Sequence, residues 1–401
     1  MNFLFDIINL QFIVAIAFFG VAYSMRKEPF KVLLLFCHIL VIFLLNDVLF
    51  SPKYFGDQLR QVDAAQTIRG EFFQTKNTFQ KHGPKMGFAS LVYAAIPFPF
   101  INSVQSLAMI NFLIFLAMFI FLRKYKLSNK RVDYFFLIFP SLLLYSSLAL
   151  RDTLILFFML IGLYIIIVRE KYILGLLFSS PLLIFKFQNF LMIIAAIILF
   201  KYLKNAGGLR YGFLILFTLA GAFFPDKVPV VSQIYERLET WRLALFYDQY
   251  MYDWDYISKM NVDAFYEPLG TGIVLLFQVV KYFLYMLLKP LIWEVGNPFQ
   301  LIQSLENIVI FVMILIINRY KVHNGKIREK ILFLNCLLFV SMTINGLVVF
   351  NFGSAVRYKF PFIVVYFVYF FFLLSTDEQL KKQKDSLKSY FIRNKSSMSV
   401  S

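Results

Sequence analysis

The sequence predicts an all-α integral membrane protein that crosses the bilayer many times. Hydrophobic residues make up 60% of the 401 residues, and 51 residues are Phe, whereas a soluble domain is about half apolar. The apolar residues form continuous runs, many of them close to the ~20 residues that a bilayer-spanning helix needs. Continuous runs also exclude a transmembrane β-barrel, because its strands alternate apolar and polar residues.

Basic residues outnumber acidic ones, and their positions indicate the membrane topology. The net charge is +17, from 40 Lys and Arg against 23 Asp and Glu. Most basic residues lie in short segments between apolar runs, as in cytoplasmic loops, which argues against nucleic acid as a partner. The two Cys residues form neither a disulfide framework nor a CxxC motif. We therefore expect a protein of the lipid bilayer with no metal and no other cofactor.

The amino-terminal half is expected to begin outside the membrane. The first run lacks the basic start and the small-residue cleavage site of a signal peptide, so we interpret it as a retained helix. The polar segment 51–102 should lie outside, and its apolar end, 86–102, carries Pro97 and Pro99 and is expected to be interfacial or re-entrant. The spans expected up to residue 204 are 3–23, 32–50, 103–122, 133–150, 153–168, 172–185 and 190–200.

The carboxyl-terminal half continues the same alternation. Its expected spans are 211–224, 301–317, 331–350 and 360–374, and the run 272–288 within the second external loop is expected to be re-entrant or interfacial. The chain should thus have about eleven spans. We predict one polytopic membrane domain over 1–375, with external loops at about 51–102 and 225–300, and a basic cytoplasmic tail at 376–401.

Charged residues within the apolar runs are the strongest functional signal. Arg151 and Asp152 separate two apolar runs, and Lys186, Lys289 and Arg357 interrupt others, although a charge at membrane depth costs several kcal/mol. The topology brings these cations to the outer side, where they suit a polyanion such as a lipid-linked pyrophosphate. The alternative is that Arg151 extends to the interface and pairs with Asp152.

The external loops add candidates for proton transfer and for sugar binding. Asp57 is a candidate general base for a sugar hydroxyl, with Arg60 beside it, although an Asp that caps the following helix is an equally good interpretation. His82 is a further candidate for proton transfer, yet a lone loop His is more often a surface residue. The aromatic and acidic run 247–255 suits carbohydrate, whereas interfacial anchoring enriches the same aromatic residues.

Three segments resemble one protein family. Tyr285–Glu294 followed by Asn297–Asn307 resembles the Arg-Pro-x-x-x-Glu and Ser-Leu-Glu pattern of bacterial O-antigen and capsule repeat-unit polymerases, the Wzy class. Phe139–Asp152 and Asn351–Pro361 are similar to two further segments of those proteins. Lys289 stands where the pattern has Arg, and an ammonium lacks the two-pronged donor geometry of a guanidinium.

The resemblance implies a glycosyltransferase of the broad GT-C kind in the bacterial cytoplasmic (inner) membrane. A growing glycan on undecaprenyl pyrophosphate would be transferred at the outer face to a new lipid-linked repeat unit, with a chain-length regulator as a protein partner. Asp57 matches the acidic residue of the first external loop in related enzymes only by position. We place Asp57, His82 and Glu294 as catalytic candidates, and Arg60, Asp152, Glu306 and Tyr358 as supporting residues.

Two other functions stay open. A transferase that uses a polyprenyl-phosphate sugar would need one phosphate clamp and a clear acidic motif in the first loop. A flippase for lipid-linked oligosaccharides should show internal repeats and cations along a two-sided pathway. The sequence shows no internal repeat, its external loops are unequal, and the expected cations lie on one side. These features favour the enzyme.

Overall fold

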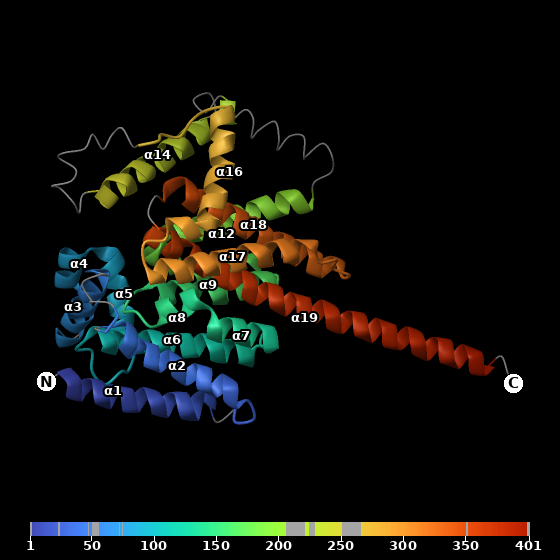
Figure 1. The fold of residues 1–401 in the computed structure, drawn as a ribbon, viewed down its shortest axis with the longest axis horizontal. Coiled ribbons are helices and arrows are strands. Elements are labelled where there is room, and N and C mark those ends of the chain that lie inside the picture. The colour runs from blue at the N-terminus through green and yellow to red at the C-terminus, as the bar shows by residue number, and fades with distance from the viewer. Residues whose placement is uncertain are drawn as a thin grey trace. The chain divides into compact units, whose positions relative to one another are not determined.

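In the computed structural model, the regular elements of the described residues are helices joined by turns and loops (Figure 1). These residues are 2–22, 25–46, 48–49, 56–71, 73, 75–205, 221–223, 229–250, 266–349 and 352–398. Within them, 6 helices are long and apolar enough to cross a membrane, and shorter apolar helices lie at Pro29–Leu45, Asp152–Ile167 and Ile273–Leu288. The all-α class is thus confirmed, and the length and composition of these 6 helices support a multi-pass membrane protein. The full number of about eleven spans stays a prediction.

The chain divides into two compact units. Unit 1 comprises Met1–Leu191, Lys321–Ile331 and Val364–Ser401, and unit 2 comprises Met192–Tyr320 and Leu332–Ile363. The helices of unit 1 are α1 (Asn2–Ala17), η1 (Phe18–Ala22), α2 (Pro29–Leu45), α3 (Gly56–Gly70), α4 (Lys76–His82), α5 (Pro84–Ala95), α6 (Val104–Lys124), α7 (Lys130–Ile138), α8 (Pro140–Ser146), α9 (Asp152–Ile167), α10 (Tyr172–Ser179) and α11 (Leu182–Phe185). Those of unit 2 are α14 (Pro229–Tyr250), α16 (Ile273–Leu288), η5 (Ile292–Glu294) and α17 (Pro298–Arg319). Parts of α12 (Phe187–Lys204), α18 (Gly325–Val348) and α19 (Phe352–Met398) belong to each unit.

Helix α6 is central to the packing of unit 1. It begins at a capping box in which Ser103 and Ser106 bond each other's backbone amides, an arrangement that satisfies two amides at a helix start. Of its span, 72% is buried within the protein. The Phe115 ring stacks between the rings of His38 and Phe136 at centroid distances of 4.3 and 5.0 Å. Aromatic stacking thus joins α2, α6 and α7.

Helices α9 and α10 approach each other closely because glycine faces glycine. A Cβ atom on Gly162 would lie 1.9 Å from Ser179 Oγ, and one on Gly175 would lie 2.8 Å from the carbonyl oxygen of Gly162. Small residues commonly allow such close contact between membrane helices. The predicted turn between residues 168 and 172 is therefore a tight helical hairpin.

Proline divides two of the predicted spans. The expected span 133–150 consists of α7 and α8, which separate at Phe139 because Pro140 begins the second helix. The expected span 172–185 likewise consists of α10 and α11, which separate at Ser180 and Pro181. Proline has no backbone amide to continue the preceding helix but fits the first turn of a new one.

The polar segment 51–102, expected to be an external loop, contains α3, α4 and α5, which lie together in Figure 1. Ala64, Ala65 and Ile68 of α3 are buried. Arg69 donates to the carbonyl oxygens of residues 94, 96 and 98 at 3.0, 2.5 and 2.7 Å and so holds the end of α5. Polar helices with a narrow buried face have low mean hydropathy, so hydropathy alone does not distinguish them from a loop.

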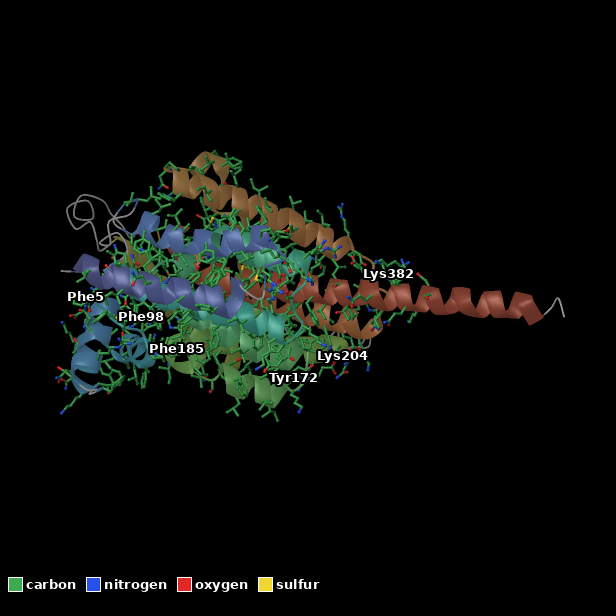
Figure 2. All side chains as sticks on the ribbon, turned by 90° about the horizontal axis from the view of Figure 1, so that it is seen from below. Phe5, Phe98, Tyr172, Phe185, Lys204 and Lys382 are labelled. Carbon is green, nitrogen blue, oxygen red and sulfur yellow. The ribbon has the colours of Figure 1, made fainter. Side chains whose placement is uncertain are left out.

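The first helix packs at the same end of unit 1. Asn9 of α1 bonds both the amide and the carbonyl of Phe100, at 3.1 and 2.9 Å. The ring of Phe5 lies 4.5 Å from that of Phe100, and the ring of Phe12 lies 5.8 Å from that of Phe98. Phe5 and Phe98 are both labelled at this end in Figure 2. The segment 96–100 is therefore held by α1, whatever its depth in the bilayer.

Unit 2 is built on a close contact between α16 and α18. A Cβ atom on Gly346 would lie 2.2 Å from the carbonyl oxygen of Tyr282. Leu269, Tyr282 and Leu347 form a buried hydrophobic cluster beside this contact. Helix α14 occupies part of the segment 225–268 that was expected to be an external loop.

Helix α19 begins before the predicted span 360–374 and continues beyond it. A turn was expected over 351–359, but among the described residues α19 begins at Phe352 and continues through Gly353 and Pro361. The predicted tail is also helical as far as Met398, and Lys382 lies on the part of α19 that extends past the other helices of unit 1 (Figure 2). Two other predictions lie largely outside the described residues. They are the span 211–224, of which residues 211–220 are not described, and the aromatic run 247–255, of which residues 251–255 are not described.

Candidate functional site

The turn that carries Arg151 is held by buried polar side chains from four helices of unit 1. Asn111 of α6 donates to the carbonyl oxygens of Leu148 and Leu150 at 2.6 and 2.7 Å. The hydroxyl of Tyr93 on α5 lies 3.0 Å from the Leu150 oxygen and 2.9 Å from Asn111 Oδ1. Buried backbone groups of a non-helical turn need such partners. The turn is therefore defined by the surrounding helices.

Helices α2 and α3 contribute the remaining contacts to this turn. Asn46, at the end of α2, donates to the carbonyl of Ser147 at 3.0 Å. Gln58 of α3 accepts from the amide of Ala149 at 2.7 Å. Both side chains are buried. The segment predicted to be the first external loop thus supports the turn directly through Gln58.

Arg151 and Asp152 lie at the start of α9, as their place between two apolar runs predicts. Arg151 precedes the helix and is half-buried, and Asp152 is buried in its first turn. A carboxylate there interacts favourably with the positive end of the helix. Thr153 donates to the carbonyl of Tyr145 at 2.8 Å and ties α9 to α8. Asp152 therefore has a structural reason for its position besides the predicted pairing with Arg151.

Lys186 lies at a second interruption of the helices in unit 1. It separates α11 from α12 and has non-helical backbone angles (φ −158°, ψ 78°), and its side chain is buried. Its carbonyl accepts the amide of Asn189 at 2.9 Å. The break expected at Lys186 is present, but the turn was expected to extend to Asn189, whereas α12 already begins at Phe187. Arg151 and Lys186 belong to unit 1, whereas Lys289 and Arg357 belong to unit 2, so the shared cation cavity stays a prediction.

The candidates of the first loop lie on α3 and α4. Asp57 is in the first turn of α3, where a carboxylate stabilises a helix start, and Arg60 is exposed one turn later. His82 Nε2 lies 2.9 Å from Asp63 Oδ2, and Lys81 Nζ lies 2.7 Å from the same oxygen. Asp63 therefore orients His82, and no feature of the sequence alone identified Asp63.

Asp63 makes the stability of the part of unit 1 around α3 and α4 depend on pH. The hydrogen bond from Lys81 holds the pKa of Asp63 below its ordinary 3.8, against an opposing effect of burial, and His82 lowers it further. Because the folded-state pKa is the lower one, the stabilisation is complete above the pKa of the unfolded chain. It is lost as the pH falls through the folded-state value.

We therefore expect Asp63→Asn to lower the melting temperature at about pH 6, and the difference from wild type to shrink toward about pH 3. Lys81→Met should reproduce part of the loss at the higher pH. The measurement is thermal unfolding of the detergent-solubilised protein across this range at low salt, because exposed charges are screened at high salt. An equal difference at all pH values would contradict the assignment.

In unit 2, Lys289 and Glu294 form an ion pair at the end of α16. Lys289 directly follows the last residue of α16, and Glu294 is the last residue of the short helix η5. The two side chains are directly paired, and Glu294 also accepts the amide of Leu291 at 3.0 Å. The Lys289 ammonium lies 4.0 Å from the centre of the Tyr285 ring. The spacing of the Lys-Pro-x-x-x-Glu motif thus places its Lys and its Glu in direct contact.

The pair with Lys289 also sets the ionisation of Glu294. Burial raises the pKa of this carboxyl, but the hydrogen bonds from Lys289 and from the Leu291 amide outweigh that effect and hold the pKa below its ordinary value. An ionised, paired carboxylate is well suited to orienting a lysine. It is a weaker base than an unpaired carboxylate. Glu294 is thus better suited to positioning than to taking a proton.

Two further motifs meet the same end of α16. Asn307, from the Ser-Leu-Glu-Asn segment on α17, donates to the carbonyl oxygen of Lys289 at 2.7 Å. Lys359, from the Arg-Tyr-Lys segment on α19, donates to Asn307 Oδ1 at 2.7 Å. Glu306 is buried beside Asn307 and interacts electrostatically with Lys359. Two of the three segments that carried the family resemblance therefore contact each other within unit 2.

The remaining predicted residues of this unit lie on the first turns of α19. Arg357 and Tyr358 are half-buried, whereas Lys359 is buried. The sequence reasoning selected Arg357 and Tyr358 but not Lys359 or Asn307. Lys359 interrupts the same apolar run as Arg357 and could have been selected by the same rule. Asn307 carries no charge and could not.

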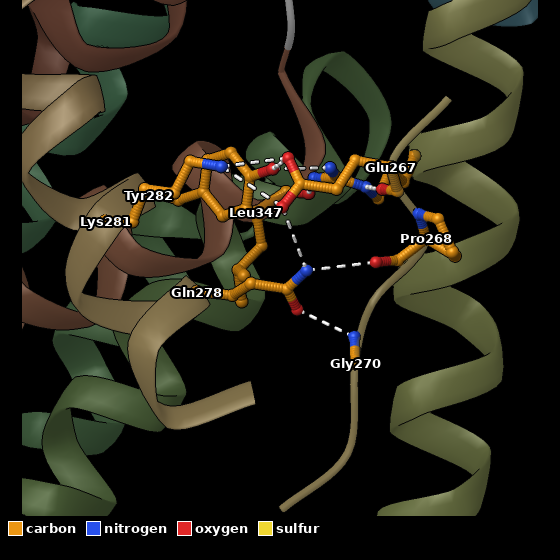
Figure 3. A network of polar contacts seen from close by, with 8 residues as sticks. Glu267, Pro268, Gly270, Gln278, Lys281, Tyr282 and Leu347 are labelled. Carbon is orange, nitrogen blue, oxygen red and sulfur yellow. Dashed lines mark hydrogen bonds and ion pairs between the residues drawn. The ribbon is translucent and has the colours of Figure 1, made fainter. Parts of the chain in front are cut away.

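A second polar network, drawn in Figure 3, joins α14 to α16 and α18. Arg242 of α14 is fully buried, and its guanidinium donates to the carbonyl oxygens of Glu267 and Leu347 and to the hydroxyl of Tyr282, at 2.8, 2.6 and 2.8 Å. The carboxylate of Glu267 accepts from Tyr282 at 2.7 Å and from Lys281 at 2.9 Å. These contacts fix the segment that follows residue 265 against α14 and α16.

Chemically, the described residues offer cations and carboxylates but no metal centre. Among the parts of the chain that the structure describes, no group of three or more His, Cys, Asp and Glu residues is arranged to hold a metal ion. The paired lysine and the half-buried arginines can neutralise an anion. The carboxylates and His82 can orient or accept a proton. No protein-family model matches the chain, and neither a curated protein nor a solved structure matches it significantly.

Proposed function

We propose that this protein is a membrane glycosyltransferase that polymerises oligosaccharide repeat units carried on undecaprenyl pyrophosphate, at the outer face of a bacterial cytoplasmic membrane. One observation carries the proposal: the Lys289–Glu294 motif, Asn307 and Lys359 meet at one end of α16. These residues come from two chain segments that resemble repeat-unit polymerases. Motifs that are distant in sequence and adjacent in space support a shared role.

The proposed reaction uses the pyrophosphate as the leaving group. A hydroxyl at the free end of the acceptor repeat unit attacks the anomeric carbon of the donor glycan and forms a new glycosidic C–O bond. The bond from that carbon to the pyrophosphate oxygen breaks, undecaprenyl pyrophosphate departs with the electron pair, and the hydroxyl proton passes to a base. Asp57 and His82 are the candidates for that base.

The cations act on the charge that grows during the reaction. Arg151, Lys186, Lys289 and Arg357 are proposed to bind the pyrophosphate and stabilise its increasing negative charge as the C–O bond breaks. The two arginines can each donate two parallel hydrogen bonds to phosphate oxygens. The half-buried state of Arg151 and Arg357 supports this role, since a ligand needs access to the guanidinium.

The test is polymer formation by the purified protein in lipid vesicles that contain the lipid-linked repeat unit. Arg151→Ala and Arg357→Ala should abolish the glycan ladder while the protein remains in the membrane, because each removes a bidentate phosphate contact. The matched control is Arg328→Ala, which removes an exposed arginine of the predicted cytoplasmic side. Asp57→Asn tests the base.

Other outcomes of this assay would overturn the proposal. Wild-type ladders in both arginine variants would contradict the cation site. Transfer of single sugars from a polyprenyl monophosphate would indicate the other transferase class. Movement of the lipid-linked unit across the vesicle membrane without elongation would indicate a flippase.

A further inference from the structure

Two side chains that come from distant helices hold the end of α16. Asn307 Nδ2 lies 2.7 Å from the carbonyl oxygen of Lys289 and 3.3 Å from that of Leu288. Lys359 Nζ lies 3.3 Å from the same Lys289 oxygen and 2.7 Å from Asn307 Oδ1. Asn307 has 0% and Lys359 has 2% of its surface exposed. Neither side chain can touch a ligand, so any effect on the reaction must pass through the residues that they hold.

The held atoms are ones that a helix leaves without partners. The last carbonyl groups of an α-helix have no amide within the helix to accept from, and a positive charge near that end is favourable. An amide and an ammonium buried in an apolar environment are costly unless they are hydrogen-bonded. Asn307 and Lys359 donate to the carbonyl oxygens at the end of α16, and the Asn307 side chain also accepts from the Lys359 ammonium. Each buried polar group thus has a hydrogen-bond partner.

The consequence concerns the direction in which the Lys289 side chain leaves the helix. A backbone carbonyl held by two side chains fixes the orientation of its own residue. Lys289 then reaches Glu294, which is itself held by the amide of Leu291. Lys359 of α19 and Asn307 of α17 therefore hold the backbone of Lys289, and this backbone positions the ammonium that is proposed to bind pyrophosphate.

We infer that Asn307 and Lys359 are positioning residues for Lys289 and hold its ammonium, with Glu294, in the orientation that binds the lipid pyrophosphate. Binding of the pyrophosphate by Lys289 rests on the proposed function, whereas the orientation of the Lys289 side chain does not. A catalytic constellation needs such support, because small misplacements of a binding group cost much of its effect.

The experiment measures the reactivity of Lys289 and polymer formation separately, on the full-length protein in lipid vesicles. Amine acetylation of Lys289 is quantified by peptide mass spectrometry as a ratio to Lys281, an exposed lysine on the same helix α16. Lys359→Met and Asn307→Leu remove the polar contacts with little change in volume. Lys359→Arg restores donors. The matched control is Ser304→Ala, one turn before Asn307 on α17, where the buried hydroxyl has no partner among the described residues.

We expect Lys359→Met and Asn307→Leu to raise the labelling ratio about tenfold, which corresponds to the loss of one charge-assisted hydrogen bond. Polymer formation should fall by about the same factor through the turnover number. Lys359→Arg should restore both quantities in part, and Ser304→Ala should change neither.

The outcomes distinguish the inference from the proposed function. An unchanged ratio in both variants would overturn the positioning role, even with polymer lost. Equal increases at Lys281 and Lys289 would indicate general loosening of the protein and also overturn it. A raised ratio, in a protein whose wild type forms no polymer, would support the positioning role and reject the proposed function.

Discussion

Replacing Arg242 with Met is expected to release α14 from its contacts in unit 2 and to lower the stability of this unit by about 3 kcal/mol or more. Arg242 is fully buried and donates to two backbone carbonyls and to Tyr282. The substitution leaves the carbonyls of Glu267 and Leu347 without the donor that they have in the folded protein. Met fills similar space but offers no hydrogen.

The carboxylate of Glu267 adds to this effect. Burial raises the pKa of Glu267, while hydrogen bonds from Lys281, Tyr282 and Gln278 hold it below its ordinary value. Arg242 also bonds the hydroxyl of Tyr282, which itself donates to Glu267. Removal of Arg242 should therefore leave this Tyr282 hydroxyl less firmly positioned. Arg242→Lys keeps the charge but not the planar fork, so we expect it to be intermediate.

The measurement is thermal unfolding of the solubilised protein together with limited proteolysis within α14. Arg237→Met is the matched control, because Arg237 is an exposed arginine of the same helix, and it should change stability by no more than about 0.5 kcal/mol. Equal melting temperatures and cleavage rates for the two variants would show that Arg242 does not hold α14.

The second large effect is expected for Asn111→Leu in unit 1. Leucine has a similar shape but cannot donate to the carbonyls of Leu148 and Leu150, which Asn111 bonds at 2.6 and 2.7 Å. Each buried group left unsatisfied costs about 1–3 kcal/mol, so the turn that carries Arg151 should rearrange or the unit should unfold.

A graded series tests this interpretation. Tyr93→Phe removes one hydroxyl that reaches the same turn and should cost about 1 kcal/mol. Asn77→Leu, an exposed asparagine of α4, is the control and should be nearly neutral. Thermal unfolding should rank the loss as Asn111 above Tyr93 above Asn77. A neutral Asn111→Leu would mean that the turn does not depend on the α6 side chain.

The positions where apolar runs are interrupted could be predicted from the sequence. Arg151 and Lys186 were expected at turns, and the structure has α9 beginning at Asp152 and a break between α11 and α12 at Lys186. Both predictions succeeded because a charge between two apolar runs is a local signal. Helices α3 and α4 were expected to be a loop, since hydropathy does not separate a polar helix from a loop, and a turn was expected where α19 begins at Phe352.

The buried polar residues could not be predicted in the same way. Arg242 bonds Leu347, Asn111 bonds Leu148, and Lys359 bonds Asn307, so in each case the partner is distant in the chain. A single sequence shows that such a residue is polar. It does not show which backbone carbonyl the residue satisfies. Asn111 and Asn77 are the same residue type, yet Asn111 is buried beneath the turn that carries Arg151, whereas Asn77 is exposed.

The sequence by itself determined the helical membrane class, because long apolar runs have no other stable form in a bilayer. It also determined that cations interrupt those runs. Only the tertiary structure decided that Lys289 pairs with Glu294, that Asn307 and Lys359 hold the end of α16, and that α3 and α4 form helices. The physical reason is that hydropathy is a property of neighbouring residues, whereas the satisfaction of a buried polar group depends on atoms brought together by folding.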